Sequence, residues 1–190
     1  MTRLHRPLPF TFEDRTGQLS NSDFDEMYDR LFFHVARQPG HTSTKIYEMN
    51  NRASRFRSTL PLTRDPIVHL DFQADESLGT VSFAKAPLQF SIPMSRYLKK
   101  TAFFGASTTR KFTASDGRDY KWGFNLYAGQ EWTCTTMDNG LVAHYDLKPA
   151  NVRAYDVSGN NLIIYEPFAH IIPEILASFL IMRHIKQFNL

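Results

Sequence analysis

The chain has 190 residues, of which 42% are hydrophobic and 14% aromatic, enough for one well-packed domain and too few for two of ordinary size. Its net charge of +3 permits an anionic partner without requiring one, and its single cysteine excludes an internal disulfide framework. The N-terminal sequence lacks an apolar run of signal-peptide length, and neither end carries a lipidation motif, so we expect a cytoplasmic protein.

Residues 1–22 are polar and carry Pro7, Pro9 and Gly17 with little periodicity, which predicts a poorly ordered N-terminal arm. The predicted domain is then residues 23–190. Its first segment, Asp23–Ala36, mixes the acidic start of a helix with the strand-like run Leu31–Val35, and strand is the favoured interpretation.

Short alternating or β-branched segments follow, punctuated by turn residues such as Gln38-Pro39-Gly40 and Ser115-Asp116-Gly117. The predicted strands are residues 44–50, 54–60, 67–72, 80–83, 88–92, 111–113, 119–126, 131–137, 141–145, 151–157 and 162–166. The first two are expected to form a hairpin, residues 88–92 an edge strand between two prolines, and residues 94–100 a helical turn. Many short strands at spacings of about ten residues indicate an antiparallel sandwich or barrel.

The last segment, residues 168–188, predicts a helix that is apolar on nearly all sides and therefore has to be buried. Pro173 and Glu174 suit its first turn, and Arg183, His184 and Lys186 suit its last. A membrane span needs about 20 largely uncharged residues, and Glu174 and Arg183 interrupt this one. We therefore expect no transmembrane span.

The two predictions fit together. A sheet of many strands hides its edges by closing into a barrel, and about twelve strands leave a lumen wide enough for a helix. The fold class expected is mainly β: a closed antiparallel barrel of about twelve strands around the hydrophobic C-terminal helix.

Several segments carry a family resemblance. They are Tyr97–Lys100, Phe103–Gly105, Arg110–Trp122 (RKFTASDGRDYKW), Leu141–Tyr145 and Leu162–Ile164 with the terminal helix. They resemble an uncharacterised fungal (basidiomycete) domain family of the tubby C-terminal-like superfamily, over roughly residues 45–190. The resemblance implies a twelve-strand barrel around a central helix and brings no established activity. Better-known relatives, including tubby proteins and phospholipid scramblases, suggest membrane-lipid association by analogy of fold alone.

Three basic clusters form a candidate anion site. The residues are Arg52, Arg55, Arg57 and Arg64; Arg96, Lys99 and Lys100; and Arg110 with Lys111. If residues 54–58 form a strand, Arg55 and Arg57 project from one face, and paired guanidiniums can grip a phosphate. The predicted ligand is a phosphoinositide headgroup or an acidic membrane surface. The alternative is a solvated outer face of the barrel.

Other function classes have weaker support. A protein-interaction or defence-related module without lipid binding remains open, whereas nucleic acid is disfavoured by 19 acidic residues and the lack of a binding motif. A hydrolase or nuclease could use His144-Tyr145-Asp146, but adjacent strand residues face opposite sides. No cofactor or metal is predicted, because no Cys/His spacing suits zinc, and Cys134 is expected to pack beside Trp132.

Three polar residues interrupt the apolar helix at intervals of four: His170, Glu174 and Ser178. They form either a polar relay in the lumen or, as we favour, hydrogen bonds to partners on the surrounding strands.

Overall fold

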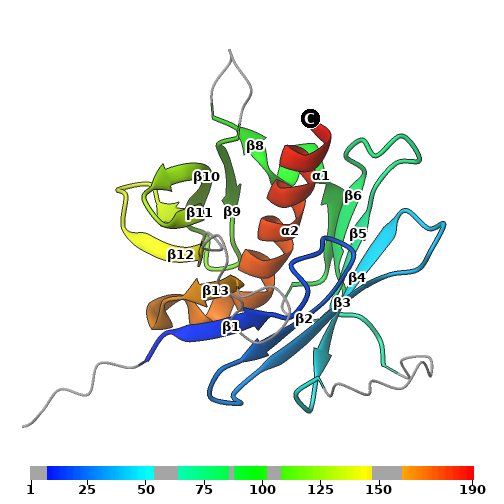
Figure 1. The fold of residues 1–190 in the computed structure, drawn as a ribbon. Coiled ribbons are helices and arrows are strands. Elements are labelled where there is room, and N and C mark those ends of the chain that lie inside the picture. The colour runs from blue at the N-terminus through cyan, green and yellow to red at the C-terminus, as the bar shows by residue number, and fades with distance from the viewer. Residues whose placement is uncertain (1–7, 54–63, 86–87, 102–107, 147–159) are drawn as a thin grey trace, which may run out of the picture.

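The computed structural model describes residues 8–53, 64–85, 88–101, 108–146 and 160–190 (Figure 1). The described residues contain thirteen strands, two α-helices and one 3₁₀-helix. In chain order these are β1 Phe10–Asp14, β2 Asn21–Glu26, β3 Phe32–Arg37, β4 Ser43–Met49, β5 Val68–Asp71, β6 Thr80–Phe83, β7 Phe90–Pro93, α1 Met94–Tyr97, β8 Lys99–Lys100, β9 Arg110–Thr113, β10 Asp119–Tyr127, β11 Gln130–Thr136, β12 Leu141–Asp146, β13 Asn160–Ile164, η1 Glu166–Ile171 and α2 Ile172–Phe188.

All thirteen strands belong to one antiparallel sheet with the order β7-β6-β5-β4-β3-β2-β1-β13-β12-β11-β10-β9-β8. Neighbours in the sheet are neighbours in the chain except where β1 pairs with β13, from Phe10 opposite Ile164 to Asp14 opposite Asn160. This pairing joins the N-terminal and C-terminal halves of the sheet into one surface.

The structure differs here from the expected arm over residues 1–22, because residues 10–14 are a strand in the middle of the sheet. Phe12 is buried and its ring packs 5.7 Å from that of Phe33 on β3. A five-residue strand beside two prolines is too short for its alternation to be distinguished from a polar arm, and only its partners stabilise it.

The predicted closure into a barrel is not confirmed. The sheet curls around α2, but its edges, β7 and β8, do not pair with each other among the described residues. Between them the chain turns through α1, whose Tyr97 and the following Leu98 are buried. Pro93 ends β7, and β8 has only two residues, so neither edge offers a long ladder to the other. We call this gap in the ladder the seam.

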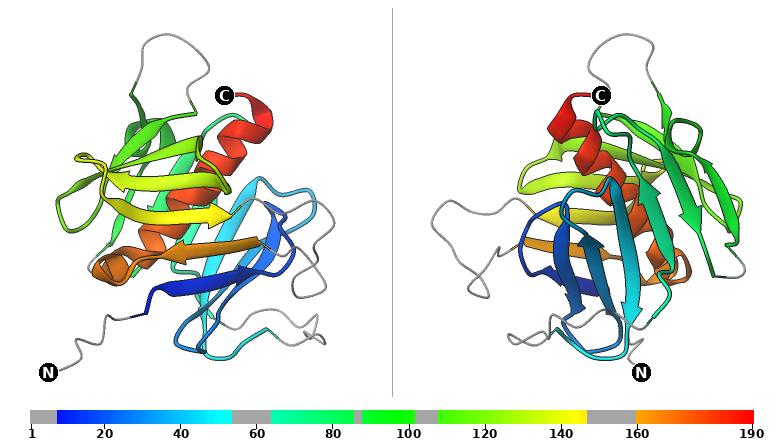
Figure 2. Two further views of the ribbon diagram at one scale, coloured as in Figure 1. Left: turned by 60° about the vertical axis from the view of Figure 1, so that its left-hand side comes forward. Right: turned by 90° about the vertical axis from the view of Figure 1, so that its right-hand side faces the viewer.

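The hydrophobic core lies between α2 and the concave face of the sheet (Figure 2). The predicted all-round burial of the helix is confirmed, since most of its residues from Ile172 to Ile185 are buried. Phe179 packs against the rings of Trp122 and Tyr145, at 5.6 and 4.8 Å. Pro173 lies in the first turn as predicted, but residues 166–171 are a 3₁₀-helix rather than part of the α-helix.

The segment Glu166–Phe188 is long and apolar enough to cross a membrane, with a mean hydropathy of 1.4, and 72% of the window that meets this criterion is buried inside the fold. Core helices of soluble proteins meet the same criterion. The expectation of no transmembrane span therefore stays a prediction.

Most predicted strands are confirmed within one or two residues, as is the edge position of β7. The helical turn predicted over residues 94–100 is confirmed only for α1, because Lys99 and Lys100 form the strand β8. Segment 23–36 contains parts of two strands, β2 and β3, instead of one. The predicted strands 54–60 and 151–157, and the hairpin expected of the first, lie outside the described residues.

Candidate anion-binding site

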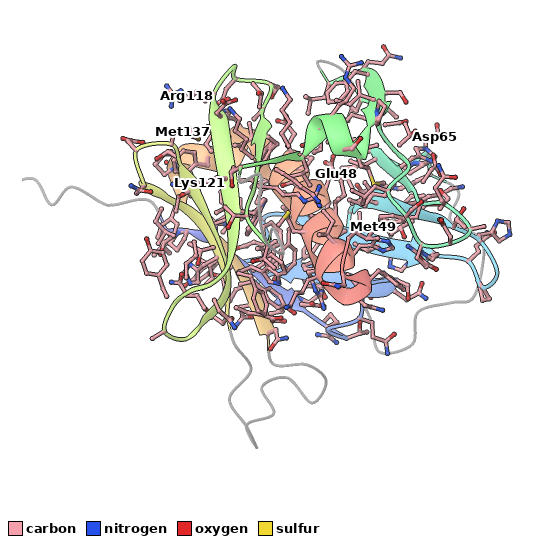
Figure 3. All side chains as sticks on the ribbon, turned by 90° about the horizontal axis from the view of Figure 1, so that it is seen from above. Glu48, Met49, Asp65, Arg118, Lys121 and Met137 are labelled. Carbon is pink, nitrogen blue, oxygen red and sulfur yellow. The ribbon has the colours of Figure 1, made fainter. Side chains whose placement is uncertain are left out.

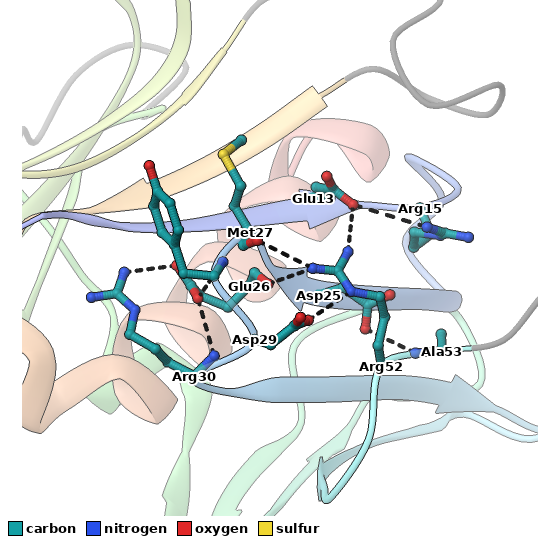
Figure 4. Close-up of polar contacts among 10 residues, drawn as sticks. Glu13, Arg15, Asp25, Glu26, Met27, Asp29, Arg30, Arg52 and Ala53 are labelled. Atoms are coloured by element: carbon teal, nitrogen blue, oxygen red, sulfur yellow. Dashed lines mark hydrogen bonds and ion pairs between the residues drawn. The ribbon is translucent and has the colours of Figure 1, made fainter.

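Arg52, the first residue of the predicted anion site, is held by acidic neighbours (Figure 4). Its Nε donates to Asp29 Oδ1 at 2.8 Å, and its Nη1 to Glu13 Oε2 at 3.0 Å. Its Nη2 donates to the carbonyl of Glu26 at 2.8 Å. Arg52 therefore ties the chain after β4 to β1 and to the β2–β3 turn, and its guanidinium has few donors left for a ligand.

Two buried carboxylates, Asp25 and Glu26, lie beside the Arg52 guanidinium (Figure 4). Burial tends to raise the pKa of Glu26, but hydrogen bonds from Arg30 and from the backbone outweigh it and hold the pKa below its usual range. Asp25 accepts the backbone N–H of Ala53 at 3.1 Å, and burial raises its pKa. The region is a structural network in which the arginines neutralise buried acids.

Arg55 and Arg57 lie outside the described residues. Arg64 donates to the carbonyl of Glu48 at 3.1 Å and lines a shallow cavity of about 550 Å³ together with Asp65 and Lys85. Lys85 is itself paired with Glu48 at 2.8 Å. Two acids balance two bases here, which does not favour an anion. Viewed from above, Asp65 lies on the other side of α2 from Arg118 (Figure 3).

The second and third basic clusters meet at the seam. A cavity of about 290 Å³ lies there, lined by Ile92, Arg96, Tyr97, Lys99, Lys111, Phe112 and Thr113. We call it the seam pocket. It combines residues of β7, α1, β8 and β9, so it exists because the sheet stays open between its two edge strands.

Strand register places the lysines of this pocket together. Lys99 on β8 is directly opposite Lys111 on β9, so their side chains leave the same face of the sheet. Arg96 lies on α1, three residues before Lys99, and both side chains are exposed. Among the described residues, no carboxylate lies within ion-pairing distance of either one.

Like charges opposite each other are unfavourable, and one acid relieves them. Asp119 on β10 accepts from Lys111 Nζ at 3.0 Å and from Thr113 Oγ1 at 2.6 Å. The hydrogen bond from Thr113, and then that from Lys111, hold the pKa of Asp119 below its usual range. The pocket thus presents three cations with one carboxylate beside it, and this region is net positive.

The floor of the seam pocket is apolar. Ile92, Phe112 and the ring of Tyr97 form it, and Tyr97 and Phe112 are almost fully buried. Burial raises the pKa of the Tyr97 hydroxyl well above its usual value, with smaller contributions from Glu174 and Cys134 inside the sheet. That hydroxyl belongs to the core and does not reach a ligand in the pocket.

Two other residues of these clusters are not in the pocket lining. Lys100 is exposed beside the pocket and is paired with Arg110 across the β8–β9 ladder. Arg110 points inward and is only 3% exposed. It donates to the main-chain oxygens of Leu98 and Leu190, and burial lowers its pKa. Successive residues of a strand face opposite sides, which separates Arg110 from Lys111.

The polar residues of the C-terminal helix segment meet partners on the strands and turns, as favoured from the sequence. Glu174 accepts the N–H and the hydroxyl of Ser115, both at 2.8 Å, and burial raises its pKa. Trp122 Nε1 donates to Ser178 Oγ at 2.8 Å. His170 pairs with Asp116 at 3.2 Å. Ser115 and His170 thus have different acidic partners, which does not make a catalytic triad.

In the sequence His144-Tyr145-Asp146, the tyrosine hydroxyl does not join the other two side chains. His144 pairs with Asp146 at 3.3 Å, while the Tyr145 hydroxyl donates to Asp14 at 2.6 Å within the core. Cys134 and Trp132 are buried, as expected of packing residues. The described part of the chain contains no group of three His, Cys, Asp or Glu side chains that could hold a metal ion.

Sequence reasoning missed Thr113 and Asp119. A signal for both was present, because the turn at Ser115-Gly117 sets the register of β9 and β10 and places Asp119 opposite Thr113. Lys111 and Thr113, two residues apart on one strand, then share a face with that acid.

A family model described as a family of unknown function (DUF6593) matches residues 17–187. The chain therefore belongs to this family, which assigns it no activity. Comparison with the curated proteins and with the solved structures gives no match.

Proposed function

We propose that this protein is a non-enzymatic binding module that takes an anionic, phosphate-bearing ligand at the seam pocket. The ligand class is a phosphoinositide headgroup or an acidic membrane surface. One observation carries the proposal: Arg96, Lys99 and Lys111, which are up to 15 residues apart in the chain, surround one cavity, and the first two have no acidic partner among the described residues.

The chemistry of the pocket suits a phosphate. A guanidinium such as that of Arg96 can donate two parallel hydrogen bonds to phosphate oxygens, and lysines add compact positive charge. A volume of about 290 Å³ lies at the lower end of small-molecule sites and is adequate for a headgroup rather than a whole lipid. Exposed cations at an open edge can also approach a flat anionic surface.

The family placement forms part of the proposal. The segments Tyr97–Lys100 and Arg110–Trp122, which resemble fungal proteins of the tubby C-terminal-like superfamily, supply Tyr97 at the end of α1, the strands β8 and β9 of the pocket, and the start of the neighbouring β10. We propose that the chain is such a fungal protein, cytoplasmic and peripheral to membranes. The tubby-like enclosure of a central helix supports this, with the ladder open at the seam instead of closed.

The test is co-sedimentation with vesicles of phosphatidylcholine alone, with added phosphatidylserine, or with added phosphatidylinositol bisphosphate, at low and physiological salt. We expect salt-sensitive binding to the anionic vesicles, lowered at least about tenfold by Arg96→Glu with Lys99→Glu. Arg118→Glu is the control, because this exposed residue lies outside the pocket. Competition by soluble inositol trisphosphate distinguishes a headgroup site from attraction to a surface.

If Arg118→Glu lowers vesicle binding equally, the binding depends on general surface charge and not on the seam pocket. A separate variant, Arg55→Glu with Arg57→Glu, tests the other predicted cluster. If vesicle binding is lost only in that variant, the anion site lies at Arg55 and Arg57 and not at the seam pocket.

A second candidate is a protein-interaction module without lipid binding. Leu126 and Tyr127, next to the β10–β11 turn, are each about half exposed, and as consecutive residues they offer apolar surface to a protein partner. If no vesicle binds the wild-type protein, Leu126→Ser with Tyr127→Ser becomes the first variant to compare in a search for protein partners.

A further inference from the structure

A carboxylate next to the seam pocket already binds two of the pocket's side chains. One carboxylate oxygen of Asp119 accepts from Lys111 Nζ at 3.0 Å, and the other accepts from Thr113 Oγ1 at 2.6 Å. Both donors line the pocket, and Lys99, a third lining residue, acts electrostatically on the same carboxylate. Asp119 thus uses the groups that a bound phosphate would use.

We propose that Asp119 is an internal competitor that weakens ligand binding at the seam pocket, and so sets the concentration at which an anion can enter. The inference rests on the proposed function, since it concerns the same pocket. It goes further by assigning an affinity-determining role to a residue that does not line the cavity.

Competition follows from the available donors. Lys111 is only partly exposed, and its ammonium is oriented by Asp119 across the β9–β10 ladder. An entering phosphate gains full use of this ammonium only if the carboxylate gives it up or shares it. The Thr113 hydroxyl has one proton, so donating it to the ligand ends its bond to Asp119.

Arg96 and Lys99 behave differently, because no described carboxylate pairs with them. They are the residues that attract the first contact, whereas Lys111 is released second. Removing the charge of Asp119 should therefore strengthen binding by releasing Lys111 and Thr113, without introducing a new ligand-binding residue.

The experiment titrates ¹⁵N-labelled full-length protein with inorganic pyrophosphate and follows the backbone amides of Lys99, Lys111 and Thr113. Asp119→Asn keeps the shape of the side chain and removes its charge. We expect it to bind about tenfold more tightly than wild type, the order expected for one charge a few ångströms away in partly screened surroundings. Asp71→Asn, which removes one exposed charge on β5, should bind like wild type.

The outcomes separate the two proposals. Equal affinity of wild type and Asp119→Asn overturns the competitor role and leaves the anion site standing. No shift in either protein at saturating pyrophosphate overturns the anion site and the inference with it. A gain matched by Asp71→Asn assigns the effect to net charge and overturns the competitor role.

A double variant tests the mechanism. If Asp119 acts by holding Lys111, then in a Lys111→Met background Asp119→Asn should gain much less than tenfold. An undiminished gain would overturn competition for this lysine. Thermal unfolding of each variant verifies that the fold is intact before the affinities are compared.

Discussion

Arg52 and Arg96 are alike in the sequence and opposite in the structure. Each lies in a basic cluster near a strand end. Arg52 donates to two carboxylates and to the carbonyl of Glu26, whereas Arg96 is exposed at the seam with no acidic partner among the described residues. The difference lies in the neighbours, not in the residue type.

The comparison shows how a basic cluster becomes a candidate site. Buried acids, Asp25 and Glu26 among them, gather at the end of β2, and a guanidinium placed beside them is used by the fold rather than left for a ligand. At the seam, Asp119 is the only carboxylate among the described residues that pairs with any of the three cations. Excess positive charge beside a cavity, rather than positive charge alone, makes the seam the better candidate.

The largest loss of stability should follow from removing one of the buried acids near Arg52. Glu26 is fully buried and accepts the backbone N–H groups of Tyr28 and Arg30 at 2.8 and 3.2 Å, and the Arg30 guanidinium at 2.7 Å. Glu26→Ala leaves these donors unpaired and should lower the free energy of unfolding by about 3 kcal/mol in urea denaturation. Glu48→Ala removes a partly exposed acid that pairs with Lys85; it is the control and should change the free energy of unfolding by less than about 0.5 kcal/mol.

The next largest loss of stability should come from replacing Arg52 itself, with Arg96 as the comparison. Arg52→Ala should lower the free energy of unfolding by about 2 kcal/mol, because the buried Glu13 loses its 3.0 Å ion pair and keeps the longer pair with Arg15, at 3.9 Å. Arg96→Ala should change it by less than about 0.5 kcal/mol, as for other exposed residues. Equal destabilisation by the two variants in the same urea denaturation assay would contradict the distinction between a structural Arg52 and a ligand-binding Arg96.

A buried histidine, His184, should give the smallest effect on stability and extends the comparison to a base inside the core. His184 is stacked 3.7 Å from the ring of Phe72 and bonds the carbonyl of Glu76 at 2.7 Å. Burial lowers its pKa from the ordinary 6.5, and the positive charge of Arg37 adds to this, while the backbone bond and the Glu76 carboxylate oppose it. With too little negative charge nearby, this base stays neutral, whereas Arg52 stays charged.

The sign of the pH dependence follows. Above pH 6.5 His184 is neutral in both the folded and unfolded states and has no effect on stability. As the pH falls below 6.5 the unfolded state takes up a proton more readily, so stability is lost until the pH passes below the lowered folded pKa. Midpoints of urea denaturation at pH 7.5 and 5.5 should differ more for wild type than for His184→Phe. An equal difference in both proteins would assign the pH dependence to other groups.

Much of the fold could be predicted because its signals are local. Alternation identified β5 and β6, the Asp116-Gly117 turn identified the β9–β10 hairpin, and the continuous apolar run identified α2 as a helix that needs enclosure. The strand β1 could not be identified, because Phe12 is stabilised by Phe33 and by pairing with β13, almost 150 residues away.

Only part of the candidate site could be predicted from such local signals. The clusters around Arg96 and Lys111 were visible, but their convergence was not. Alternation along β9 separates Arg110 from Lys111, and the register of β8 on β9 brings Lys99 to Lys111. Arg52 could not be removed from the candidates by sequence, because its partners Glu13 and Asp29 lie 39 and 23 residues before it.

The sequence by itself determined that short antiparallel strands surround a helix with no polar side, because strand alternation, turn residues and helix-end residues act within a few positions of one another. Only the tertiary structure decided that the sheet stays open between β7 and β8, and which cations keep their charge free at that opening. Whether a charge is neutralised depends on carboxylates a few ångströms away in space, and their distance along the chain does not reveal them.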